Sequence, residues 1–513
     1  MADQVSATED RDTAELHRLG YAQELRRRMS GFSNFAVSFT IISILSGCLT
    51  LYGFGMNTGG PVDLIWGWVL VGLMVTFVGL AMAEVCSSFP TAGGLYYWAA
   101  KLGGKNGPAW SWFTGWFNLL GQVAVTAGID FGLALFADAL LNLLFGYPTT
   151  PGFVVLLYAA ALFAHGLLNT FGVRLVALLS DISVWWHILG VIVIVAILAL
   201  VPKQHQSASF VFTSFVNNTG ADFAGVTVFV FLVGLLMAQY TFTGYDASAH
   251  MTEETRNAAI AGPRGIVMSI LVSLVAGWVL LIGVTFAIQN YTAEATAVTP
   301  AAQIFIDAVG TGTAAFLLVV VVGAQFFCGM ASVTANSRMI YAFSRDGAVP
   351  GHRFWHRVNK RSRTPTNSIW LAAVGAFILG VPYLWSSTAY AAVTSIATIG
   401  LYIAYGIPIL LRLKAGDSFE RGPWHLGRWS RPIGIIAVTW IGVISILFIL
   451  PQVFPVTILN FNYAIVAVAA VVIGTGVAWV VSARKWFKGP KIQGSAEELA
   501  AIEAELASVG TAA

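Results

Sequence analysis

The stretch Thr243-Gly244-Tyr245-Asp246-Ala247-Ser248-Ala249-His250 lies inside an apolar run of the length that crosses a lipid bilayer. It brings glycine, hydroxyl side chains and a carboxylate together at a depth where no water pairs with exposed backbone groups. An ionisable residue at that depth is costly and marks a functional position by default. The stretch therefore predicts a membrane helix that is interrupted near Gly244.

The first apolar run contains a similar stretch, Ser43-Ile44-Leu45-Ser46-Gly47-Cys48-Leu49-Thr50, which predicts a break near Gly47. Broken helices at corresponding places in two halves of a chain are the sequence sign of a transporter's binding site. The two runs are five spans apart, as two inverted five-span repeats require. Freed backbone N–H groups suit a carboxylate, and freed carbonyls suit an ammonium group. The alternative is that glycine and serine only let the helices pack closely.

The whole chain has the composition of a membrane protein. Of its 513 residues, 57% are hydrophobic and only 10% are charged, whereas soluble domains are about 25% charged. All three cysteines lie in apolar runs, which argues against a disulfide framework and against a zinc site. The N-terminal segment lacks the short basic-then-apolar pattern of a cleaved signal peptide.

These features predict an all-α membrane protein with twelve transmembrane helices, each needing about 20 mostly apolar residues. The predicted spans lie near 33–55, 64–88, 110–142, 152–170, 175–201, 225–249, 264–288, 313–343, 366–382, 388–411, 432–450 and 462–483.

The basic residues between the spans predict the orientation. With the N-terminus in the cytoplasm, only Lys203 of the 27 Lys and Arg residues falls outside, as the positive-inside rule requires. Their alternation with apolar runs argues against a nucleic-acid surface. We expect a multi-pass protein of the cell membrane with both termini cytoplasmic and a solvated tail after Lys491. The predicted segments are an N-terminal segment (1–30), a first repeat (31–201), an extracellular loop (202–224), a second repeat (225–412), two further spans (432–483) and a cytoplasmic tail (484–513).

Two motifs carry a resemblance to a known family. The stretch 83–98, AEVCSSFPTAGGLYYW, resembles the end of the second span in amino acid–polyamine–organocation (APC) permeases. The stretch 243–255, TGYDASAHMTEET, resembles the sixth span of their amino acid/choline branch, which includes 4-aminobutyrate permeases. The resemblance covers nearly the whole chain.

The resemblance implies the LeuT-type fold, in which spans 1–5 and 6–10 are inverted repeats and helices 1 and 6 are interrupted. It implies a substrate site between spans 1, 3, 6, 8 and 10, and alternating access by a rocking movement. The substrate-binding candidates are Ser43, Ser46, Gly47, Cys48, Asp130, Gln239, Tyr240, Thr243 and Gly244. Asp130 lies in the third span, where it could hold a substrate ammonium or pair with a polar group of another span.

Four residues are candidates for coupling and gating. The resemblance places His187 where proton-coupled relatives carry a lysine, and a histidine can exchange a proton near neutral pH. The alternative is a neutral core histidine bonded to a carbonyl. Ser332 lies beside Ala331, where a sodium-coupled relative has a second hydroxyl, so a sodium site lacks one ligand. Asp246 is a gating residue or a cap of the second half-helix, and Glu84 a latch at the inner end of the second span.

The predicted function is import of an amino acid or related amine by a secondary active transporter, with proton coupling and 4-aminobutyrate or an α-amino acid as substrate. The alternatives are a choline, ethanolamine or polyamine permease and an amino acid exchanger. The chain has no HExxH, GxSxG, CxxC or phosphate-loop motif, which argues against an enzyme and against a metal or other cofactor. The expected partners are the substrate, the proton and the lipid bilayer, with the protein a monomer or weak oligomer.

Overall fold

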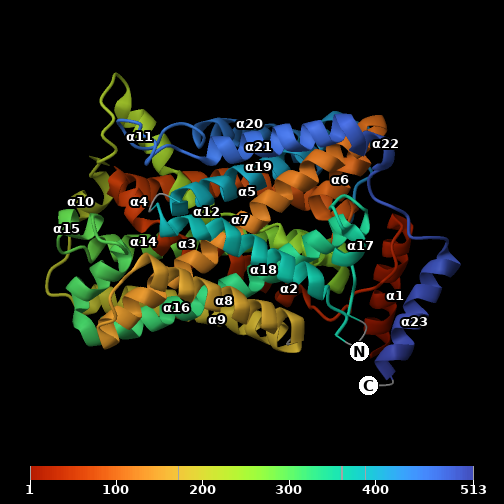
Figure 1. Cartoon of the computed structure of the whole chain (residues 1–513), viewed down its shortest axis with the longest axis horizontal. Coiled ribbons are helices and arrows are strands. Elements are labelled where there is room, and N and C mark those ends of the chain that lie inside the picture. Colours follow the sequence, from red (N-terminus) through yellow and green to blue (C-terminus); the bar gives the residue numbers. More distant parts are fainter. Residues whose placement is uncertain (1, 172, 360–361, 387–388, 512–513) are drawn as a thin grey trace.

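The computed structural model describes residues 2–171, 173–359, 362–386 and 389–511. Its helices lie side by side in one bundle, and α1 and α23 extend from the end that carries both chain termini (Figure 1). We call this the terminal end. The bundle helices are α2 (Gly31–Ile42), α3 (Ile44–Thr50), α4 (Tyr52–Asn57), α5 (Trp68–Ser88), α7 (Gly107–Phe145), α8 (Pro151–Phe171), α9 (Val173–Leu200), α11 (Val226–Gly234), α12 (Leu236–Thr241), α13 (Ala247–His250), α14 (Ala258–Phe286), α16 (Pro300–Arg345), α18 (Thr366–Gly380), α19 (Ala389–Ala415), α20 (Ser430–Leu447) and α21 (Ala464–Ala478).

Shorter elements connect these helices or lie at the ends of the chain. The remaining helices are α1 (Ala2–Leu19), α6 (Gly94–Leu102), α10 (Ala208–Thr213), α15 (Tyr291–Ala295), α17 (His352–Trp355), α22 (Arg484–Trp486) and α23 (Ala496–Thr511). The strands β1 (Thr58–Gly59) and β2 (Val216–Asn217) form one antiparallel pair that the hydropathy pattern does not predict, because two-residue strands leave no periodic signal.

Eleven helices in the described ranges are long and apolar enough to cross a membrane. They are Gly31–Thr50, Asp63–Ser88, Gly104–Phe145, Pro151–Phe171, Leu175–Leu200, Ala258–Phe286, Pro300–Arg345, Thr366–Leu384, Ala389–Ser418, Gly427–Leu447 and Ala464–Trp486. Each coincides with a predicted span. The sixth predicted span, 225–249, contains the shorter apolar helix Val226–Thr241. The chain is therefore a multi-pass, all-α membrane protein.

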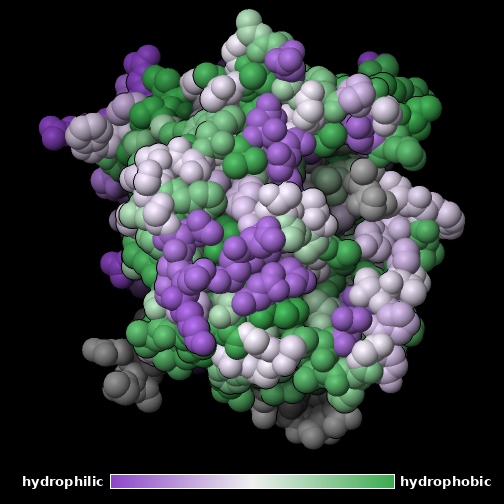
Figure 2. Space-filling model, turned by 90° about the vertical axis from the view of Figure 1, so that its left-hand side faces the viewer, coloured by the Kyte–Doolittle hydropathy of each residue, from purple (hydrophilic) through white to green (hydrophobic). Residues whose placement is uncertain are grey.

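One predicted span starts earlier than expected. The helix predicted over 313–343 begins at Pro300, and Gly310 interrupts its helical geometry with φ 74° and ψ 167°. The residues before Gly310 therefore form a separate helical piece, which explains why the hydropathy signal begins only after it. At the end of the bundle opposite the termini, hydrophilic residues gather across the middle of the face (Figure 2). Such a face suits contact with water rather than lipid.

The core lies where α7 packs against α8, α16, α18 and α19, and where α5 packs against α14. Small residues let α7 and α19 approach closely: a Cβ on Gly121 would lie 2.7 Å from the backbone nitrogen of Leu401. In contrast, α20 and α21 run along the outside of the bundle (Figure 1), and most residues of α21 are exposed. The interior of the bundle is thus built from α2–α19.

The tail does not behave as the solvated appendage that its charges predict. The backbone N–H of Gln493 donates to the carbonyl of Gly20 at 2.9 Å, and its side-chain oxygen accepts from the N–H of Ala22 at 2.7 Å. His17 Nε2 lies 2.7 Å from Glu503 Oε1, so α23 pairs with α1. The tail is ordered because it satisfies backbone groups of the N-terminal segment, a tertiary effect that its own sequence does not reveal.

Replacing Gly121 by alanine tests the α7–α19 contact. Because the new Cβ would meet rigid backbone, we expect Gly121→Ala to destabilise the protein by about 1–3 kcal/mol. The matched control is Gly442→Ala in α20, where a Cβ would meet nothing within 4 Å. Thermal unfolding of the detergent-purified proteins measures both. Equal unfolding midpoints for the two variants would contradict the close packing.

Candidate functional site

The first interruption lies at Ser43, between α2 and α3. Ser43 adopts the left-handed conformation, with φ 35° and ψ 81°, which costs a non-glycine residue about 1–2 kcal/mol. Its N–H donates to the carbonyl of Phe39 at 3.1 Å, and its carbonyl accepts from Ser46 at 2.8 Å. The predicted break at Gly47 is therefore wrong by four residues. Gly47 lies inside α3. A glycine is needed there because a Cβ would be 2.5 Å from Oγ1 of Thr241.

The second interruption spans the residues between α12, which ends at Thr241, and α13, which begins at Ala247. Gly244 has φ 86°, and a Cβ there would collide with the side chain of Ile41. Two tyrosines of α19 form hydrogen bonds with the backbone of this non-helical segment. The hydroxyl of Tyr402 donates to the carbonyl of Phe242 at 2.6 Å, and the hydroxyl of Tyr405 accepts from the N–H of Gly244 at 3.4 Å.

The two interrupted segments contact each other in antiparallel order. Gly47 faces Thr241, while Ile41, earlier in the first segment, faces the later Gly244. Farther along, the hydroxyl of Ser38 donates to the carbonyl of Tyr245 at 2.9 Å. The chain thus brings both stretches singled out from the sequence together in the interior.

Asp246 joins the second interruption to two neighbouring helices. Its fully buried carboxylate accepts from Gln122 Nε2 of α7 at 2.8 Å and from the hydroxyl of Tyr405 of α19 at 2.8 Å. His250 Nε2 lies 3.3 Å away. The side chain makes no capping hydrogen bond to α13. Of the two roles considered for Asp246, the geometry matches a link between helices and not a cap.

His187 contacts the first interruption directly. Its Nδ1 lies 2.7 Å from the carbonyl of Ser183, and its Nε2 lies 2.7 Å from the hydroxyl of Ser43. A carbonyl only accepts, so Nδ1 carries the hydrogen, and Nε2 of the neutral ring accepts from Ser43. A second proton on the ring would turn Nε2 into a donor and force the Ser43 hydroxyl to reverse. The bond to the Ser183 carbonyl is the one expected of a neutral core histidine, the alternative considered from the sequence, and the bond to Ser43 joins the ring to the residue at the break.

Asp130 pairs with a histidine of α8. Its Oδ1 lies 2.8 Å from His165 Nδ1, and both side chains are fully buried. Gly329 of α16 leaves the space, because a Cβ there would collide with the Asp130 carboxylate. Asn169, one turn after His165 in α8, donates to the backbone carbonyls of His165 and Met330 at 3.0 and 3.1 Å, so both side chains join α8 to a neighbouring helix. Asp130 thus lies at the junction of α7, α8 and α16.

The other candidates divide between the site and its surroundings. The hydroxyl of Tyr240 is buried beside Gly128 and makes no hydrogen bond within the described ranges. Thr243 donates to the carbonyl of Tyr240 at 2.6 Å, and Ser332 bonds the hydroxyl of Thr126 at 2.8 Å. Buried Ser46 and Cys48 lie in α3.

Two candidates contact the peripheral helix α20 or the loop that precedes it. Gln239 accepts from Trp440 at 3.2 Å. Glu84 accepts from Arg412 Nε at 3.2 Å, from the N–H of Leu426 at 3.2 Å and from the hydroxyl of Ser430. Glu84 therefore ties α5 to the segment that joins α19 and α20, away from the two interruptions.

Sequence reasoning missed Tyr402 and Tyr405, which lie three residues apart in an otherwise apolar span. Two tyrosines at helical spacing in mid-span are a usable signal, because each buried hydroxyl needs a partner. Of the described residues, no group of three or more His, Cys, Asp or Glu side chains comes together that could hold a metal ion.

The chain is similar to known permeases over most of its length. A family model described as amino acid permease matches residues 29–472. The chain is 45% identical to the amino-acid permease BAT1 of Arabidopsis thaliana, over 94% of this chain and 96% of that protein. A rice homolog of BAT1 is 44% identical, over 94% and 96% of the two chains. The GABA-specific permease of Saccharomyces cerevisiae is 31% identical, over 93% and 86%.

Gly244→Ala tests the contact between the interruptions. Gly225 has a similar φ of 83° but open space around it, so Gly225→Ala should lose only about 1–2 kcal/mol to backbone strain. Gly244→Ala carries the same strain plus the collision with Ile41, and we expect a further loss of about 1–3 kcal/mol. Thermal unfolding of both variants measures the difference. The contact is refuted if they unfold at the same temperature.

Proposed function

This chain belongs to the amino acid permease family, and we propose that it is a proton-coupled secondary transporter that imports its amino acid by alternating access. Family membership makes it an amino acid transporter, and its relatives bear the names of permeases, not enzymes. The observation that carries the proposed mechanism is the antiparallel contact of the two interrupted helices in the interior.

The proposed architecture has twelve spans. Val226–Thr241 together with α13 (Ala247–His250) would form the sixth span as two half-helices, and residues 31–201 and 225–412 the two inverted repeats of a LeuT-type fold. The antiparallel order of the interruptions supports this repeat, because inverted repeats place corresponding segments in opposite directions. In this topology the terminal end faces the cytoplasm of a cell-membrane protein that acts as a monomer or weak oligomer.

The proposed substrate site lies at the interruptions. Its residues are Ser43, Ser46, Gly47, Cys48, Asp130, Gln239, Tyr240, Thr243 and Gly244. The unpaired hydroxyl of Tyr240 supports this choice, since a buried polar atom without a partner favours a ligand that supplies one. Asp130 would hold the substrate ammonium in exchange for its contact with His165.

Proton coupling is proposed at His187. Protonation reverses the hydrogen bond between its ring and Ser43, and so favours a different geometry at the first interruption. Asp246 would transmit movement of the second interruption to α7 and α19 through Gln122 and Tyr405. The hydroxyl of Ser332 bonds that of Thr126, and Ala331 beside it has no hydroxyl to offer a sodium ion, which favours the proton as the coupling ion. Glu84 would latch the cytoplasmic end through Arg412.

The proposed substrate is 4-aminobutyrate or an α-amino acid. The name of the yeast relative supports 4-aminobutyrate, and that of the Arabidopsis relative supports amino acids in general. Choline, ethanolamine or a polyamine, and exchange in place of symport, are the alternatives. Uptake of each labelled solute into proteoliposomes, with imposed proton or sodium gradients, decides among them. Uptake driven by sodium alone would overturn proton coupling.

His187→Gln separates coupling from transport. Glutamine preserves a donor and an acceptor but does not titrate, so the variant should bind and exchange substrate while proton-driven accumulation falls at least about 100-fold, the low end for a lost acid–base group. The matched control is His205→Gln, because His205 lies in the loop after α9 and its side chain bonds, among the described residues, only the carbonyl of Leu198. Counterflow and gradient-driven uptake are measured on the same proteoliposomes. Intact accumulation in His187→Gln would exclude the residue from coupling.

Asp130→Asn tests the proposed ammonium contact. Loss of a hydrogen bond to a charged group costs about 1.5–3 kcal/mol, so substrate affinity should fall about 10- to 100-fold. The variant also leaves His165 without its carboxylate, so the double variant Asp130→Asn/His165→Gln serves as control. Binding by the double variant at wild-type affinity would show that Asp130 only pairs with His165.

A further inference from the structure

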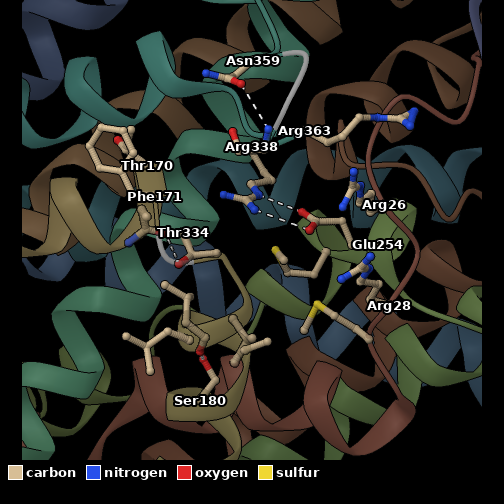
Figure 3. Close-up of a pocket in the computed structure, with 18 residues that line it drawn as sticks. Arg26, Arg28, Thr170, Phe171, Ser180, Glu254, Thr334, Arg338, Asn359 and Arg363 are labelled. Atoms are coloured by element: carbon tan, nitrogen blue, oxygen red, sulfur yellow. Dashed lines mark hydrogen bonds and ion pairs between the residues drawn. The ribbon is translucent and has the colours of Figure 1, made fainter. Parts of the chain in front are cut away.

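A large pocket opens at the terminal end, apart from the helix interruptions. Its volume is about 850 Å³, and its walls come from the N-terminal segment, α2, the end of α8, the start of α9, α16 and the loop before α18. Figure 3 shows the side chains of Arg26, Arg28 and Arg363 on the same side of the pocket as Glu254. Nothing in the proposed transport cycle uses these arginines.

The pocket carries an excess of positive charge. Four arginines and one glutamate line it, which leaves three positive charges. The glutamate, Glu254, is already paired with Arg338 at 2.8 Å. Arg26 makes no side-chain hydrogen bond or ion pair to any described residue. Burial, and then the nearby charge of Arg26, lower the pKa of Arg363. Two guanidinium groups thus line the same pocket close enough to repel each other, and the nearby charges of Glu24 and Glu503 only partly offset this repulsion.

The backbone fixes the position of Arg363. This residue has φ 57°, a left-handed conformation that costs about 1–2 kcal/mol. The N–H of Arg363 donates to the carbonyl of Asn359 at 2.8 Å, and the N–H of Asn359 donates to the carbonyl of Thr364 at 2.8 Å. Among the described residues, the guanidinium donates to the backbone carbonyls of Glu24 and Gln23, at 2.9 and 3.4 Å. Its hydrogen-bond acceptors are neutral, and the charges of Glu24 and Glu503 act on it only through space and do not prevent the lowering of its pKa.

The mouth of the pocket meets an apolar surface. Phe171 and Leu175 line the pocket and are 78% and 44% exposed. From Leu175 the exposed apolar side chains continue along one face of α9 through Leu178, Ile182 and Trp185. Their spacing of three to four residues places them on a single stripe. A ligand in the pocket would therefore have a charged end among the arginines and an apolar end along α9.

We propose that this pocket binds an anionic phospholipid, with its phosphate between Arg26 and Arg363 and its acyl chains along the exposed face of α9. Guanidinium groups are suited to phosphate, and basic pockets between membrane helices on the cytoplasmic side bind anionic headgroups. A free phosphate would satisfy the arginines alone and leave the apolar stripe unused. The assignment to the inner leaflet rests on the proposed orientation of the chain.

Native mass spectrometry of the full chain in detergent measures the binding directly. The probes are phosphatidylglycerol, phosphatidylcholine and glycerophosphoglycerol, which is the anionic headgroup without acyl chains. We expect phosphatidylglycerol to bind more tightly than either of the others. The double variant Arg26→Gln/Arg363→Gln should weaken it about 25-fold, since each basic residue near an anionic lipid surface contributes about fivefold.

The matched control is Arg428→Gln/Arg431→Gln, which removes two exposed arginines outside this pocket. It should leave the affinity for phosphatidylglycerol nearly unchanged. An equal loss in both double variants, or binding of glycerophosphoglycerol as tight as that of the lipid, would overturn the proposal. The readout requires neither transport nor a membrane orientation, so a failure of the proposed function leaves it intact. Equal thermal unfolding of the two double variants excludes misfolding as the cause.

Discussion

The structure depends on one constraint: inside lipid, every backbone N–H and carbonyl must find a partner within the protein. Unbroken helices meet it by themselves. Where α12 ends, the chain leaves the helix and loses those partners, and Tyr402 and Tyr405 of α19 replace them. The break is therefore possible only because α19 is held against α7 and beside the second interrupted segment. The close contact of Gly121 with the backbone of α19 helps to hold that helix against α7.

Buried charge obeys a related rule. Asp130 lies beside His165, Glu84 beside Arg412, and Glu253 beside Arg345. Each pair joins two different elements of the fold, so the cost of burying one charge is offset by a contact that ties the two elements together. Asp246 instead accepts two neutral donors, Gln122 and Tyr405, besides its contact with His250. Asp246 therefore ties the second interruption to both α7 and α19.

Hydropathy alone predicted where the eleven long helices lie, because length and apolar content are local properties of the sequence, although the helix predicted over 313–343 begins already at Pro300. The glycine at 244 was also located correctly, since φ 86° excludes most other residues. The first break was misplaced because Gly47 serves close packing and Ser43 carries the unusual backbone. Neither the partner of His165 nor the pairing of the tail with the N-terminal segment follows from local pattern. Both contacts depend on which segments pack together in the folded protein, and a single sequence does not reveal this packing.

The hydrogen bond between Gln493 and Ala22 joins residues that are 471 positions apart. Contacts of such long separation form late, because the intervening chain must first be ordered. During synthesis the N-terminal segment emerges first. The N–H of Ala22 and the carbonyl of Gly20 gain their hydrogen bonds to Gln493 only after the tail has been made. Until then the terminal end lacks the hydrogen bonds between the N-terminal segment and the tail. These bonds can therefore form only after the whole of the intervening chain has been synthesised.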